Sequence, residues 1–236
     1  RTLMENVLIL TPGSWKSIDK ITPATKVYRV TPTNLSCTID TIDHWKDLNG
    51  LPTYAAWNRY DRQVSFFAHD GEVIFQRSDD RQWYTTTGDQ LYRDADNTKI
   101  YLADQPTFES CNVKRAFITN EINKAVRLGR LNTSFIDGPS QLAAQALYAW
   151  KQTHGTYKAK DWNQALFIQA LFIKTGVTSN LVQQDNGLNV VPSPRDRFDV
   201  TDLTHCKRLQ ITMQPVDKNG SVVHVIANYR GHVFVM

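Results

Sequence analysis

The sequence predicts an α+β fold with an N-terminal mixed or antiparallel sheet, a helical middle around one buried central helix, and a C-terminal β-hairpin. Short apolar runs divided by turn residues fill residues 6–102, which is typical of strands. Apolar residues at helical spacing follow in residues 113–175. Two further apolar runs then flank an Asn-Gly turn, a strong hairpin signal. Strands first, helices next and a hairpin last is an α+β plan.

The N-terminal part, residues 1–110, is predicted to be mostly β-structure. Its strongest turn signal is at residues 69–71, His-Asp-Gly, because Asp-Gly between apolar runs favours a tight hairpin. Residues 47–52 are predicted to form a loop. The predicted strands are residues 6–10, 26–30, 36–42, 53–59, 63–68, 72–76, 82–87 and 99–102.

The middle part, residues 111–180, is predicted to be helical, with helices at residues 113–128, 140–153 and 161–175. The last of these begins at Asp161, a good N-cap, and ends at Gly176, which can adopt the left-handed backbone. Its apolar residues go around the whole cylinder, which predicts a buried helix. The apolar run is too short for a membrane span, so we expect the central core helix of a globular protein.

The last part, residues 181–236, is predicted to be a polar loop region followed by a hairpin. Its two strands are residues 209–216 and 222–227, joined by Asp-Lys-Asn-Gly at residues 217–220. We expect the three parts of the chain to form one compact domain, because 236 residues suffice for one large core.

Composition and motifs exclude several classes of function. A net charge of +4 with 21% charged residues is ordinary for a globular protein and does not argue for nucleic-acid binding. The three cysteines lack the spacing of a zinc site, and the six histidines are scattered, so no metal site is predicted. Neither a P-loop nor the GxGxxG or GxSxG motif is present, and no cofactor is expected.

Three sequons, at Asn34, Asn132 and Asn219, are candidate glycosylation sites if the protein is secreted. The chain begins at Arg1 without a methionine, which fits a leader already removed. We therefore expect a secreted or vacuolar glycoprotein.

A family resemblance is clearest in the segment from residue 138 to residue 169. The matching positions are Gly138, Pro139, Ala143, Ala146, Leu147, Tyr148, Gly155, Thr156, Ile168 and Gln169. Leu128-Gly129, residues 66–75 and residues 210–225 extend the match. In these positions the chain resembles the ribosome-inactivating proteins, the group of the ricin A-chain and trichosanthin. The resemblance covers roughly residues 50–230. It implies the fold order given above and an rRNA N-glycosidase ancestry.

The catalytic residues of that family do not carry over. The resemblance implies a glutamate and an arginine on the last turn of the central helix, to stabilise the ribosyl cation and to protonate the leaving adenine. The aligned positions are Ile173 and Gly176, and no glutamate occurs after Glu121. Loss of such an electrostatic group costs orders of magnitude in rate. The resemblance therefore predicts no evident catalytic residue.

The resemblance also implies an adenine pocket, and its aromatic positions fall near Val64, Phe108 and Phe198. Arg195 and Arg197 precede the last of these, and such a group could bind phosphate beside a stacked base. These five residues are the pocket candidates.

Three functions stay open. The first is a toxin or plant-defence protein of this fold, a pseudoenzyme with lost or strongly reduced rRNA N-glycosidase activity. A Cys37–Cys111 disulfide would leave Cys206 to join a lectin-like partner chain, and the ribosome is the other candidate partner. The second is an active rRNA N-glycosidase with a non-standard site at Asp196 or Asp199. The third is an ADP-ribosyltransferase-type toxin, because residues 27–30, Val-Tyr-Arg-Val, resemble the arginine strand of that class.

Overall fold

A computed structural model shows the arrangement of the chain. It describes residues 7–30, 36–47, 53–57, 64–68, 72–77, 82–93, 99–103, 107–108, 119–130, 134–184, 187–193, 198–202, 207–209, 213–229 and 231–235.

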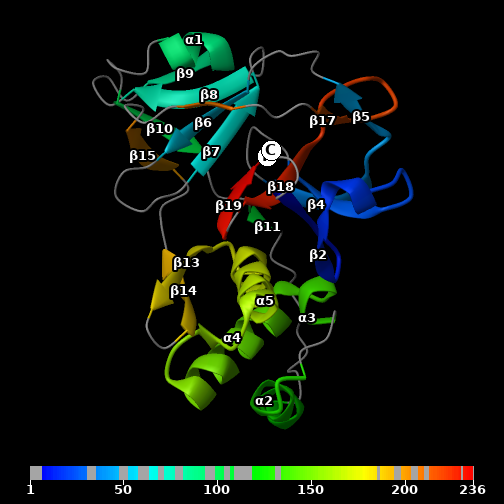
Figure 1. Cartoon of the computed structure of the whole chain (residues 1–236), viewed down its shortest axis with the longest axis vertical. Coiled ribbons are helices and arrows are strands. Elements are labelled where there is room, and N and C mark those ends of the chain that lie inside the picture. The colour runs from blue at the N-terminus through cyan, green and yellow to red at the C-terminus, as the bar shows by residue number, and fades with distance from the viewer. Residues whose placement is uncertain are drawn as a thin grey trace.

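The described residues form an α+β fold, as predicted (Figure 1). The helical elements are a 3-10 turn η2 (Ile18–Lys20), α1 (Gly88–Arg93), α2 (Thr119–Arg127), α3 (Ser134–Asp137), α4 (Ser140–His154) and α5 (Trp162–Lys174). The strands before α2 are β1 (Val7–Thr11), β2 (Ser14–Ser17), β3 (Lys26–Val30), β4 (Ser36–Thr41), β5 (His44–Asp47), β6 (Thr53–Trp57), β7 (Val64–Ala68), β8 (Glu72–Arg77), β9 (Trp83–Thr87), β10 (Lys99–Ala103) and β11 (Thr107–Phe108). The later strands are β12 (Lys158–Ala159), β13 (Thr178–Gln184), β14 (Gly187–Ser193), β15 (Phe198–Asp202), β16 (Lys207–Leu209), β17 (Met213–Val216), β18 (His224–Tyr229) and β19 (His232–Val235).

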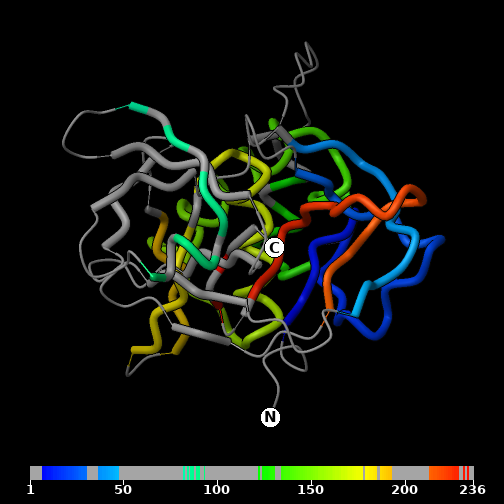
Figure 2. Tube along the Cα trace, turned by 90° about the horizontal axis from the view of Figure 1, so that it is seen from above, coloured from blue at the N-terminus to red at the C-terminus, as the bar shows by residue number. Residues whose placement is uncertain are grey.

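The main sheet joins both ends of the chain. Its order is β11-β4-β3-β18-β1-β2, with β19 paired to β18. The C-terminal strand β18 runs antiparallel to both β1 and β3 and lies between them. Figure 2 shows the blue N-terminal segments and the red C-terminal segments side by side. The last part of the chain thus completes a sheet that the first part begins.

Each face of this sheet carries an apolar cluster. Successive side chains of a strand point to opposite faces, so neighbouring residues belong to different clusters. On β3, Val27 belongs to one apolar cluster, while Tyr28 and Val30 belong to the other. On β18, Ile226 and its neighbour Ala227 divide in the same way. The larger cluster lies between the sheet and helices α4 and α5, so the core sits where the helical middle covers the sheet (Figure 1).

Helix α5 is the buried central helix that the sequence predicts. Nearly every residue from Ala165 to Lys174 is buried, on all sides of the helix. Its N-cap is Asp161, whose carboxylate accepts a hydrogen bond from the Gln164 N–H at 2.8 Å. Trp162 is the exception to the all-round burial, since it is 44% exposed on the first turn.

One buried polar network ties α5 to the end of the chain. The amide nitrogen of Gln169 donates to the carbonyls of Ser179 at 3.1 Å and Gly231 at 2.7 Å. Its amide oxygen accepts from Asn228 Nδ2 at 3.0 Å, and Asn228 Oδ1 accepts from the Gly231 N–H at 2.9 Å. Because Gln169 is fully buried, these hydrogen bonds replace the hydrogen bonds to water that its side chain loses on folding.

The hairpins differ from the predicted ones. The turn at residues 217–220 forms, and Asp217 Oδ1 accepts from two backbone N–H groups that follow it. After the single bridge Val216–Val222, however, the two strands separate: β17 pairs with β5, and β18 enters the main sheet and pairs with β19. The predicted loop region instead contains the hairpin β13–β14.

The predicted pairing across residues 69–71 is also wrong. Strand β7 pairs with β6 in the sheet β16-β6-β7, whereas β8 pairs with β9 and β10 in the sheet β15-β10-β8-β9. A turn signal reverses the chain locally, but pairing with distant strands decides which sheet each arm joins. The turn residues themselves, and the start of the helix predicted at residue 113, lie outside the described residues.

Candidate functional site

The last turn of α5 is where the resemblance implies catalytic residues. Ile173 is 1% exposed and belongs to the larger apolar cluster. Gly176 follows the helix with a φ of +77°. Thr175 closes the helix, and its hydroxyl donates to the Phe172 carbonyl at 2.7 Å. The position aligned with the family glutamate is therefore a packing position inside the core.

A buried cation that was not predicted from the sequence lies on the same turn. Lys174 is 7% exposed, and its Nζ donates to the Tyr28 hydroxyl at 3.4 Å. The same Nζ lies 5.1 Å from the centre of the Tyr28 ring, within the range of a cation–π contact. The Tyr28 hydroxyl in turn donates to the Ile136 carbonyl at 2.9 Å. The signal in the sequence was a lone lysine among apolar residues of a helix that is buried all round.

A buried thiol belongs to the same environment. Burial raises the pKa of Cys37 to about 12, and the nearby ammonium of Lys174 opposes this shift. Burial also raises the pKa of Tyr28, and the charge of Asp137 adds to the effect. At neutral pH Cys37 and Tyr28 are therefore protonated, so neither is a ready nucleophile or base. Lys174 brings a positive charge to the end of α5, which repels a developing ribosyl cation, while Asp137 is the acidic group whose charge reaches Tyr28.

The disulfide expected at Cys37 is not formed. Cys37 is a thiol in the structure, buried in the larger core cluster. Cys37 therefore serves as a small apolar packing residue of the core and not as one half of a crosslink. Cys111 and Cys206 lie outside the described residues.

The three candidates at the aromatic positions of the family pocket, Val64, Phe108 and Phe198, lie on three different strands. Phe108 is on β11, which pairs in parallel with β4 opposite Cys37 and packs against α5. Val64 begins β7, and Phe198 begins β15 opposite Ala103, in two other sheets. Only the strand of Phe108 thus lies in the main sheet beside α5.

The remaining candidates fall at the surface or outside the described part. Asn219 is exposed in the turn before Gly220, whereas Asn34, Asn132, Arg195 and Arg197 lie outside the described residues.

The residues of the two alternative enzymes are placed as follows. Asp199 is on β15 opposite Leu102, and Asp196 lies outside the described residues. Arg29, the arginine of the transferase alternative, points to the solvent side and forms an ion pair with Asp40 at 3.4 Å. An exposed pair of this kind contributes little to stability, and the buried polar group of the same strand is the hydroxyl of Tyr28 and not Arg29.

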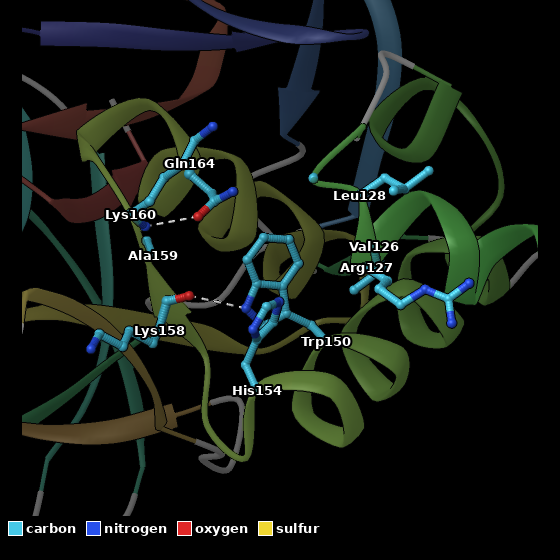
Figure 3. A pocket seen from close by; sticks show the side chains of 10 residues that line it. Val126, Arg127, Leu128, Trp150, His154, Lys158, Ala159, Lys160 and Gln164 are labelled. Atoms are coloured by element: carbon cyan, nitrogen blue, oxygen red, sulfur yellow. Dashed lines mark hydrogen bonds between the residues drawn. The ribbon is translucent and has the colours of Figure 1, made fainter.

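At the opposite end of α5 the structure has a groove of about 400 Å³ (Figure 3). It lies where α2 and α4 end and where β12 leads into α5. Its basic lining residues are Arg127, His154, Lys158 and Lys160. This groove has no signal in the sequence, because its residues are dispersed over four segments and form no motif.

Comparisons with known proteins add no identification: neither a scan against models of protein families nor a search of curated proteins found a match. Among the described helices none is long and apolar enough to cross a membrane. The described residues also contain no group of three or more His, Cys, Asp or Glu side chains that could hold a metal ion.

Proposed function

We propose that this chain is a toxin-like or defence protein with a ribosome-inactivating-protein-like fold and with lost or strongly reduced rRNA N-glycosidase activity. One observation carries the proposal: the residue aligned with the family glutamate, Ile173, is 1% exposed within the apolar core. The central buried helix, which the resemblance implies, supports the choice of family.

The chemistry of the neighbouring residues points the same way. An N-glycosidase must stabilise positive charge on the ribose as the base leaves. The ionisable side chain buried at the end of α5 is Lys174, whose ammonium contacts the Tyr28 ring and hydroxyl. A cation in this place opposes the transition state, which supports the proposed loss or strong reduction of adenine release.

The test is an assay of adenine release from purified ribosomes, with an active ribosome-inactivating protein as the positive control. We expect no release above the buffer blank at protein concentrations that fully depurinate ribosomes in the control. Robust release at nanomolar protein would contradict the proposal.

Two variants separate a true pseudoenzyme from an enzyme with a non-standard site. If any release is measured, Asp196→Asn and Asp199→Asn should abolish it under the non-standard reading. If both variants release adenine at the wild-type rate, a non-standard site at these two aspartates is contradicted.

A further inference from the structure

The groove at the start of α5 has a rigid apolar floor. Val126 and Trp150 are each 1% exposed, and Ala159 is 2% exposed. The Trp150 indole N–H donates to the Lys158 carbonyl at 3.1 Å, which fixes the ring against β12 (Figure 3). The His154 ring stands 5.1 Å from the indole, tilted by 45°. With the indole donor already engaged, polar recognition in this groove must come from its rim.

The rim is cationic on several sides. Figure 3 shows Arg127, Lys158 and Lys160 on different sides of Trp150 and His154, with the charged ends of Arg127 and Lys158 turned outward. All four basic side chains are exposed, so they can turn toward a ligand. No described residue that lines the groove is acidic. None of the four forms an ion pair with another described residue.

Helix-end stabilisation accounts for only part of this charge. Arg127 and His154 lie in the last turns of α2 and α4, where basic residues complement the helix dipole. Lys158 and Lys160 lie on β12 and just before α5, away from any helix C-terminus. Lys160 is held in place because its backbone N–H donates to Gln164 Oε1 at 2.8 Å. The dipole of a helix C-terminus therefore does not account for these two lysines.

We propose that this groove binds a compact polyphosphorylated small molecule. Its volume of about 400 Å³ falls within the usual range of small-molecule sites. Several cations around one cavity suit a ligand with several closely spaced negative charges. The site is independent of the proposed loss of glycosidase activity. Helix α5 has 13 residues, so at about 1.5 Å per residue the groove lies roughly 20 Å from Lys174.

The test is isothermal titration calorimetry with tripolyphosphate and with ATP as probes, at low salt. The variant Lys158→Gln/Lys160→Gln removes two rim charges. The matched control, Lys46→Gln/Lys218→Gln, makes the same change in net charge at exposed lysines on β5 and in the 217–220 turn. We expect the wild type to bind both probes, the rim variant to bind at least about tenfold more weakly, and the control to stay within about twofold.

Arg127→Gln, on a different element, is a second rim variant and should also weaken binding. Thermal unfolding of each variant shows whether it is folded. The proposal is overturned if the wild type binds neither probe, or if the control loses as much affinity as the rim variant. It is also overturned if a single-stranded RNA oligonucleotide binds at the rim and tripolyphosphate does not displace it.

Discussion

Gln169→Leu should destabilise the protein strongly, although it replaces a polar residue by an apolar one inside the core. Gln169 is fully buried and makes three hydrogen bonds, to the Ser179 and Gly231 carbonyls and to the Asn228 amide. Leucine has a similar size but cannot make any of them.

The magnitude follows from the partners left behind. Each buried polar group that loses its hydrogen-bond partner costs about 1–3 kcal/mol. Three such groups amount to roughly 3–9 kcal/mol, and the extra apolar burial of leucine returns about 1 kcal/mol. We therefore expect the free energy of unfolding to fall by about 2 kcal/mol or more. The matched control is Gln152→Leu on the exposed side of α4, which should change it by less than about 0.5 kcal/mol.

Urea unfolding followed by far-UV circular dichroism measures both variants. A double-mutant cycle with Asn228→Leu adds a sharper criterion, because two residues of one network should show less than the sum of their separate effects. A loss below about 1 kcal/mol for Gln169→Leu, or strict additivity with Asn228→Leu, would show that the network does not hold α5 to the chain end.

Two further predictions concern the same core. Burial raises the pKa of the Cys37 thiol to about 12. The protonated thiol therefore contributes fully to the stability of the folded protein below the ordinary pKa of cysteine, and this contribution is lost as the pH rises from about 9 to about 12. Cys37→Ala should flatten the decline of unfolding free energy across that window, and slopes equal to the wild type would refute this. Gly231→Ala should lower the free energy of unfolding by about 1–3 kcal/mol, because φ at this residue is +85° and an added Cβ would lie 2.9 Å from Leu181 Cδ1. Gly155→Ala, with φ +74° and open space around it, should cost less in the same urea assay.

Local signals in the sequence predicted the central helix well. A residue that can cap a helix, an apolar surface on all sides and a following glycine lie within one short segment. Their effects need no distant partner. The cap at Asp161 and the burial of Ile173 agree with this, and the exposure of Trp162 is the one departure.

Strand pairing was predicted less well, because a turn signal fixes a reversal of the chain and not the partner of each arm. The turn at residues 217–220 forms as expected, yet β18 continues into the main sheet between β1 and β3. Distant apolar faces decide such a pairing.

The sequence by itself determined the α+β class, the buried helix α5 and the absence of a glutamate at its end. Only the tertiary structure decided which residues meet at the C-terminal end of α5 and which residues form the groove at its N-terminal end. Lys174 meets Tyr28 across 146 positions of the chain, and the basic groove combines the ends of α2 and α4 with β12 and the start of α5. Neither arrangement has a local signal, because charge and burial at these sites depend on which distant segments the packed core brings together.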